Sequence, residues 1–283
     1  MSGPPVDLAH EGSLDIDPGW TEKILVGFLR REIERTGLRH AVVGLSGGLD
    51  SAASAHLAAR ALGPERVHAV LMPYRSSSPD SLLHARAVVD DLGIDAETVE
   101  ISAMVDGFEA VSGPTDRLRL GNVMARCRMT VLFDRSAAHR ALVVGTSNKT
   151  EILLGYGTLF GDLASAVNPI GDLYKTQVRA LARHLGVPDA ILEKPPSADL
   201  WPDQSDEHDL GFTYEAVDRV LALLIDARVS PETVVAAGFD GAFVERVRTL
   251  VLRTQFKRRM PVIAKVSPRS LGWDFRYPRD WNS

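Results

Sequence analysis

The sequence is poor in cysteine and has no long apolar segment. Its 283 residues include one cysteine, Cys127, which excludes an internal disulfide framework and favours a reducing compartment. No apolar run approaches the roughly 20 residues that a membrane helix needs, and the N-terminal residues lack the regions typical of a signal peptide. We therefore expect a cytoplasmic protein with no membrane partner.

The sequence also lacks an excess of positive charge. Its 32 Lys and Arg residues against 37 Asp and Glu residues give a formal net charge of −5, which makes nucleic acid a poor candidate partner. A hydrophobic content of 45% is enough for a sizeable core. We expect a loose N-terminal arm over residues 1–16, a single domain over 17–260 and a tail over 261–283 that carries Trp273, Tyr277 and Trp281.

Helical and strand patterns alternate in the first half of the chain. The sequence predicts helices at 17–37, 52–62, 79–92 and 116–139, and strands at 41–45, 67–72, 98–101 and 141–144. Strands separated by helices of ten or more residues need crossover connections and form a parallel sheet. The predicted fold is α/β, a doubly wound parallel sheet with helices on both faces.

The second half has longer loops and more helix. Residues 154–172 are rich in glycine, and residues 195–211 are rich in proline and acidic side chains. Long loops inside a compact domain tend to be functional. A helix is predicted at 173–185, and residues 213–260 are predicted to form a helical C-terminal part.

The stretch GLSGGLDS, residues 44–51, joins a predicted strand to a predicted helix. Such a loop binds anions, because the first helical N–H groups have no partner and the helix dipole is positive at this end. Ser46 and Ser51 add hydroxyl donors. The loop lacks the lysine of a Walker A motif and contains Asp50 instead. We predict a phosphate site with a magnesium ion at Asp50.

A second polar loop follows the strand predicted at 141–144. Open α/β sheets bind ligands at the carboxyl ends of their strands, where the strand order reverses. Asp50 and Glu151 would converge there and offer two carboxylate oxygens to Mg²⁺. Simpler roles stay open, because Asn148 and Glu151 have capping-box spacing and Asp50 could only complement the helix dipole.

Several motifs together resemble a known family. SGGLDS is similar to the signature of the PP-loop ATP pyrophosphatases, which cleave ATP between its α and β phosphates to adenylate a substrate. Five further motifs resemble those of the ammonia-dependent NAD synthetases within that superfamily. They are GTSNKTE, GYGTLFGD, NPIGDLYKTQV, KPPSADLWPDQSDE and NVMARCRM. The match covers roughly residues 42–211, with a weaker similarity at 257–261.

The resemblance implies a ligase that amidates deamido-NAD to NAD with ammonia, through an acyl-adenylate and with release of AMP and pyrophosphate. It implies Asp50, Glu151 and Lys175 as catalytic residues, with Asp50 and Glu151 as the magnesium ligands. Arg126 and Lys257 would contact the dinucleotide. The residues implied in ATP binding are Gly44, Leu45, Ser46, Gly47, Gly48, Leu49, Asp50, Ser51, Thr146, Lys175 and Ser197.

Each of the residues outside the glycine loop also has a plain alternative. Lys175 could be a surface cation, Arg126 an ion-pair partner and Lys257 a member of a solvated basic run. Thr146 and Ser197 could serve as turn or cap residues.

Two positions depart from the family pattern. Many members have a lysine at the position of Leu159 and an aspartate at that of Ala166, both of which contact the dinucleotide. The ATP half of the site is therefore better supported than the acceptor half. Nicotinate mononucleotide is an alternative substrate, because a site without these polar groups should discriminate less sharply.

The nitrogen donor and the assembly are further expectations. The chain has no spare length for a glutaminase domain, so free ammonia or a separate ammonia-supplying protein is expected. The family's active unit is a homodimer, and the helix at 116–139 could contribute to it. Other functions stay open: adenylation of another carboxylate or carbonyl by a PP-loop enzyme, and a nucleotide-binding regulator. A dehydrogenase is disfavoured because GxGxxG is absent.

Overall fold

The computed structural model describes residues 13–197, 199–201, 204, 206–259, 261–268 and 270. Most of the predicted arm at 1–16 and much of the predicted tail at 261–283 lie outside the described residues, as do Trp273, Tyr277 and Trp281. Among the described residues, no helix is long and apolar enough to cross a membrane.

A four-stranded parallel sheet forms the centre of the fold. Its strands are β1 (His40–Gly44), β2 (Val67–Leu71), β3 (Asp95–Thr98) and β4 (Ala141–Val144), in the order β3-β2-β1-β4. Ala41 of β1 pairs with Val67 on one side and Leu142 on the other. The strand order therefore reverses between β1 and β4, where the sequence predicts the ligand site.

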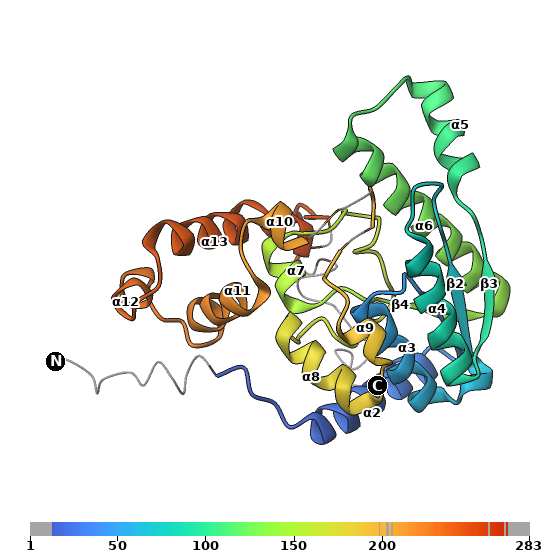
Figure 1. The fold of residues 1–283 in the computed structure, drawn as a ribbon, viewed down its shortest axis with the longest axis horizontal. Helices are drawn as coiled ribbons and strands as arrows, with labels where there is room; N and C mark the ends of the chain where they lie inside the picture. The colour runs from blue at the N-terminus through green and yellow to red at the C-terminus, as the bar shows by residue number, and fades with distance from the viewer. Residues whose placement is uncertain are drawn as a thin grey trace.

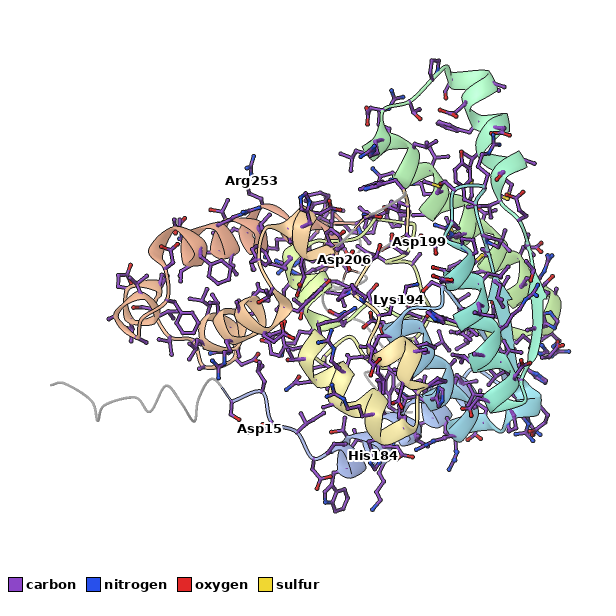
Figure 2. All side chains as sticks on the ribbon, in the orientation of Figure 1. Asp15, His184, Lys194, Asp199, Asp206 and Arg253 are labelled. Atoms are coloured by element: carbon purple, nitrogen blue, oxygen red, sulfur yellow. The ribbon has the colours of Figure 1, made fainter. Side chains whose placement is uncertain are left out.

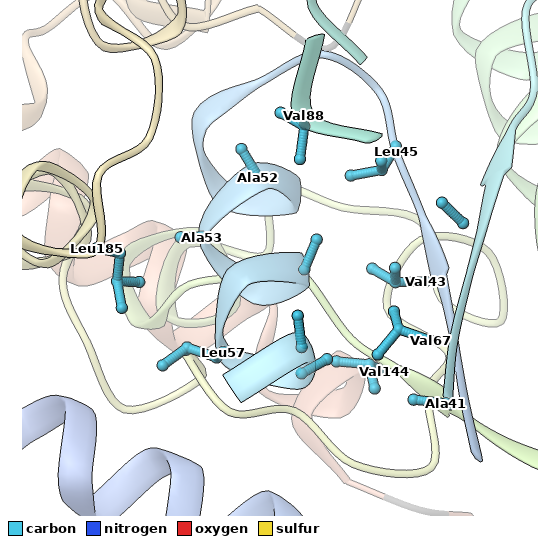
Figure 3. Close-up of a cluster of buried hydrophobic side chains, with 14 of the residues drawn as sticks. Ala41, Val43, Leu45, Ala52, Ala53, Leu57, Val67, Val88, Val144 and Leu185 are labelled. Carbon is cyan, nitrogen blue, oxygen red and sulfur yellow. The ribbon is translucent and has the colours of Figure 1, made fainter. Parts of the chain in front are cut away.

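Helices cover both faces of the sheet (Figure 1), which confirms the predicted fold class. One face carries α2 (Pro18–Glu34), α3 (Leu49–Leu62), α4 (Pro79–Leu92) and α8 (Lys175–Leu185); the other carries α5 (Ser102–Ser112) and α6 (Arg117–His139). Ala41 and Val43 belong to the apolar cluster on the face covered by α3, and Val42 belongs to the cluster on the face covered by α6. Side chains of a strand alternate between the two faces in this way. Figure 3 shows α3 beside β1, with the side chains of Val43 and Leu45 between the helix and the strand.

The remaining elements extend the α/β unit. They are α7 (Lys149–Leu154), α9 (Asp189–Leu192), α10 (Asp206–Leu210), α11 (Tyr214–Leu221), α12 (Pro231–Ala236) and α13 (Gly241–Arg253), with η1 (Pro64–Arg66), η2 (Ala222–Asp226) and η3 (Gln255–Arg258). We call α11, η2, α12 and α13 the helical lobe. It has its own apolar cluster around Val217, Val220 and Val247, and it projects from the sheet beside α7 and α8 (Figure 1).

Most predicted boundaries agree with the structure, and one strand was misplaced. The strand predicted at 98–101 is β3 at Asp95–Thr98. β3 is the edge strand and largely exposed, so its side chains give no apolar signal. The apolar Val99 and Ile101 lie just beyond it, where their N–H groups donate to Leu71 O and Pro73 O at 2.8 and 3.0 Å. Helix α5 follows and had no sequence prediction.

Candidate active site

Two serines hold the glycine loop in shape. Strand β1 ends at Gly44, and α3 begins at Leu49 with Gly48 as its N-cap. The hydroxyl groups of Ser46 and Ser51 lie 3.1 Å apart, and the Ser51 hydroxyl donates to Gly48 O at 3.0 Å. The first N–H groups of α3 therefore face the loop from a fixed frame, as an anion site requires.

Gly47 brings the loop against the start of α4. Its φ is +75°, and a Cβ built there would lie 2.1 Å from the backbone oxygen of Ser81. No residue with a side chain can occupy this position without moving one of the two segments. Glycine is thus required here by close approach as well as by conformation.

Asp50, Glu151 and Lys175 meet at the carboxyl edge of β1 and β4. The Lys175 ammonium donates to Asp50 Oδ2, and its Nζ lies 3.6 Å from Glu151 Oε1. The amide of Asn148 donates to the other oxygen of Asp50 at 3.1 Å. The predicted convergence of the two carboxylates is therefore present. Lys175 is 4% exposed, so it is not a surface cation.

Glu151 also makes the capping box that its spacing suggested. Its N–H donates to Asn148 Oδ1 at 3.0 Å, and the Asn148 N–H donates to Glu151 Oε2 at 3.4 Å. The other carboxylate oxygen, Oε1, is the one that faces Lys175. Capping at the start of α7 thus orients the side chain toward the site.

The site holds more negative than positive charge. Asp206 is buried beside the same group, and its carboxylate accepts hydrogen bonds from Tyr156 Oη at 3.0 Å and Tyr214 Oη at 3.2 Å. Burial, with the neighbouring Asp50 carboxylate, raises the pKa of Glu151 above its ordinary value. Burial alone would lower the pKa of Lys175, but the carboxylates of Asp50 and Glu151 outweigh it and raise that pKa. Lys175 therefore stays charged.

These groups line a cavity of about 820 Å³, a size typical of small-molecule sites. It runs from the glycine loop between the sheet and the loops near Lys194, Asp199 and Asp206, which Figure 2 labels. Its wall includes every residue of the glycine loop from Gly44 to Ser51 except Gly47, and it includes Thr146, Ser197 and Lys257.

The two predicted dinucleotide contacts differ in position. The Lys257 ammonium reaches the cavity wall and donates to Gly155 O at 2.8 Å and Gly157 O at 2.7 Å, so Lys257 is not part of a solvated run. Arg126 is exposed on α6, outside the described cavity wall, and its Nη2 donates to Leu159 O at 3.3 Å. Within a single copy of the protein, Arg126 therefore lies apart from the other predicted site residues.

Thr146 and Ser197 both line the cavity. Ser197 Oγ accepts from the N–H of Asp199 at 3.1 Å, which is turn chemistry of the kind the sequence left open.

Leu159 and Ala166, the two departures from the family pattern, are absent from the described cavity wall. The N–H of Ala166 donates to Val143 O at 3.0 Å beside β4.

Several site residues were not predicted from the sequence. Asp206 and Tyr156 lie within the motifs KPPSADLWPDQSDE and GYGTLFGD but were given no role, and Tyr214 lies outside every quoted motif. Arg128 is two residues after Arg126, lines the cavity and donates from Nε to Met72 O at 3.0 Å. One residue could have been singled out from the sequence: in α11, Asp218 interrupts an otherwise apolar stripe, which marks it as a buried acid that needs a partner.

Comparisons with known proteins agree on one family. The NAD synthase family profile matches residues 22–261. The chain is 58% identical over 268 residues to an NH(3)-dependent NAD(+) synthetase of Chlorobium phaeobacteroides, which covers 95% of this chain and 97% of the relative. It is 57% identical over 269 residues to the enzyme of that name from Chlorobaculum tepidum, with the same coverage.

Solved structures share the fold. An NH3-dependent NAD synthetase from Campylobacter jejuni, in complex with nitrate, has a TM-score of 0.76 and 34% identity over 88% of this chain and 100% of that chain. An NMN synthetase from Francisella tularensis has a TM-score of 0.79 and 31% identity over 88% and 99%. Fold, site geometry and sequence thus lead to the same conclusion: the chain belongs to the NAD synthase family.

Proposed function

We propose that this protein is a ligase that converts deamido-NAD to NAD with ATP and ammonia, releasing AMP and pyrophosphate. The observation that carries the proposal is the meeting of Asp50, Glu151 and Lys175 above the glycine loop, at the point where the strand order reverses. The relatives at 57–58% identity carry the name of this activity.

ATP is expected to bind with its phosphates at the start of α3. The N–H groups of that helix and the hydroxyls of Ser46 and Ser51 supply donors to the phosphate oxygens. Lys175 supplies the positive charge, and its raised pKa keeps it protonated at neutral pH. The walls beyond, which include Thr146 and Ser197, would surround the rest of the nucleotide.

The carboxylates of Asp50 and Glu151 fit a magnesium ion. Oδ2 of Asp50 and Oε1 of Glu151 both face Lys175 Nζ, so two hard oxygen donors point toward one region. Magnesium commonly binds one or two carboxylates together with phosphate oxygens of a substrate. The ion would neutralise charge on the phosphates.

The reaction needs two bond exchanges. The nicotinate carboxylate attacks the α-phosphorus of ATP, and the bond to pyrophosphate breaks. Ammonia then attacks the acyl carbon, its nitrogen loses one proton, and AMP leaves with the former carboxylate oxygen. Lys175 lies where it can stabilise negative charge on the phosphates during the first exchange, held in place by Asp50.

The second exchange must exclude water, because water would hydrolyse the adenylate. The loops that carry Tyr156 and Asp199 contribute to the cavity wall and would help to exclude water. Asp206 and the two tyrosine hydroxyls bonded to it add a polar, negatively charged wall. Such a wall favours an ammonium ion over an anion at this side of the cavity.

A substrate panel tests the proposal. Purified protein is incubated with ATP, magnesium and either ammonia or glutamine, with deamido-NAD or nicotinate mononucleotide as acceptor. We expect NAD, AMP and pyrophosphate in equal amounts from deamido-NAD and ammonia. ADP as product, or no amide from either acceptor, would contradict the proposal.

Amidation of nicotinate mononucleotide is not favoured. The Francisella tularensis structure carries the name NMN synthetase, but it is 31% identical to this chain, whereas the NAD synthetases reach 57–58%. Leu159 and Ala166 are absent from the described cavity wall, so their apolar side chains give no evidence for the smaller acceptor. The same panel compares the two acceptors directly.

A homodimer and a cytoplasmic location complete the proposal. Leu118 of α6 is 72% exposed and Val111 of α5 is 90% exposed, so each of these helices offers an apolar side chain to a second copy. Arg126 is exposed on the same helix and would act across such an interface. Light scattering after size exclusion measures the assembly. A cytoplasmic location is supported by the single cysteine and the need for ATP.

A further inference from the structure

Asp218 is a fully buried carboxylate outside the described cavity wall. It lies on α11 in the helical lobe, is 0% exposed, and neighbours Val217 and Leu221 of the lobe's apolar cluster. A charged group in such surroundings costs free energy unless hydrogen bonds satisfy it. Its partners therefore indicate why it is there.

Among the described residues, its hydrogen-bond partners belong to the two segments that carry Glu151 and Lys175. Asp218 Oδ1 accepts from Thr150 Oγ1 at 2.5 Å, and Oδ2 accepts from both the N–H and the hydroxyl of Thr176 at 2.9 Å. The N–H of Lys175 donates to Thr150 Oγ1 at 3.0 Å. One carboxylate thus joins the first turn of α7 to the first turn of α8.

Thr150 directly precedes Glu151, and Thr176 directly follows Lys175. The geometry points to a positioning role: we propose that Asp218 fixes the start of α7 and the start of α8 to each other, and thereby sets the Glu151 and Lys175 side chains for adenylation of the substrate. This inference rests on the proposed function. It gives α11, through Asp218 alone, a positioning role for the active site.

The distance between the Glu151 carboxylate and the Lys175 ammonium leaves little tolerance for movement of either helix start. Glu151 Oε1 is 3.6 Å from Lys175 Nζ, close to the limit for an ion pair, so a shift of about 1 Å would separate them. Thr150 and Lys175 are 25 residues apart in the sequence, and the helices that carry them are connected by a loop and are not strands of the sheet. Misplacement of reacting groups by about 1 Å can cost roughly 10² in rate.

Asp218→Asn is the direct test. It keeps the size of the side chain but replaces one accepting oxygen by an NH₂ group. Because Thr150 and Thr176 donate to different oxygens of Asp218, only one of the two threonines keeps its acceptor. We expect kcat for NAD formation to fall by about 10²-fold. Val247→Ala is the matched control: it weakens the same apolar cluster, leaves the threonine link intact, and should keep kcat within about 3-fold at a temperature well below unfolding.

A double-variant cycle separates positioning from general loss of structure. If Asp218 acts through Lys175, adding Asp218→Asn to Lys175→Met should change kcat by less than about 3-fold, whereas independent effects multiply. Full multiplication, or a folded Asp218→Asn protein with more than a third of normal kcat, overturns the inference. In either case the proposed function stands as long as the unchanged protein makes NAD and AMP from deamido-NAD and ammonia.

A second pair of variants applies if Asp218→Asn does not fold. Thr150→Ser keeps the hydroxyl that accepts from Lys175 and donates to Asp218, and Thr150→Val removes it. We expect near-normal kcat for Thr150→Ser and at least a 10-fold loss for Thr150→Val, with both proteins folded by circular dichroism. Equal kcat in the two variants overturns the inference.

Discussion

Asp50 and Lys175 lie 125 residues apart in the sequence and share a hydrogen bond in the site. Asp50 is in the first turn of α3, and Lys175 begins α8. Each helix start was recognisable from glycine, apolar periodicity and flanking polar residues. The pairing itself depends on the sheet order, which places β1 beside β4 and brings the following loops together.

Asp50→Asn should lower kcat by roughly 10²–10³, because a preorganised negative charge next to Lys175 is lost. The fold should persist, since the amide oxygen can still accept from Asn148. Steady-state rates of AMP formation measure the effect. Asp134→Asn, at a side chain 64% exposed on α6, removes the same charge as a control, and equal losses in the two variants would contradict the role of Asp50.

Gly47→Ala should damage the use of ATP. The new Cβ would meet Ser81 O at 2.1 Å, in a residue with φ of +75°, so the loop or α4 must move. We expect kcat/KM for ATP to fall by at least about 10-fold, given a cost on the order of 1–3 kcal/mol. Gly93→Ala is the control, because φ is +62° there and nothing lies within 4 Å of the added atom. It should lower the Tm without changing kcat/KM.

At the scale of elements, the patterns that sequence carries are periodicity, caps and turn residues. These predicted α2, α3, α4, α6 and the strands β1, β2 and β4, because each of these elements buries an apolar face. They misplaced β3, whose side chains are largely exposed. Asp206 and Tyr214 could not be assigned, because the contact between them depends on how α10 and α11 pack against the loops.

Lys257 connects two elements that sequence analysis did not relate. Its ammonium donates to Gly155 O and Gly157 O, just after the end of α7, where a cation also complements the helix dipole. Lys257→Met should lower the free energy of unfolding by about 1–3 kcal/mol, because two charge-assisted hydrogen bonds are lost.

The same variant should raise KM for deamido-NAD, because the loop after Gly155 forms part of the cavity wall. Urea unfolding and initial rates measure the two effects. Arg253→Met, at an exposed position labelled in Figure 2, is the matched loss of a cation. A Lys257→Met protein as stable as Arg253→Met would show that the two carbonyl contacts contribute nothing.

Across the whole molecule, titratable groups gather at both ends of the sheet. The carboxyl ends of the strands carry the active site, and the amino ends carry a stack of three histidines. His68 stacks on His139 with ring centroids 3.9 Å apart and on His40 with centroids 5.5 Å apart. His40, His68 and His139 come from β1, β2 and the last turn of α6, so the stack joins the sheet to the helix that covers it.

Acid should weaken this contact. Burial, followed by the charges of His68 and Arg66, lowers the pKa of His40 below its ordinary 6.5. Below pH 6.5 the unfolded chain therefore binds a proton that the folded protein resists, so the free energy of unfolding falls as the pH drops from 6.5 toward the lowered value. Urea midpoints at pH 7.5 and pH 5 should differ less in His40→Asn than in the unchanged protein. His208→Asn, at an exposed histidine on α10, should leave the difference unchanged, and an identical pH dependence in all three proteins would contradict the assignment to His40.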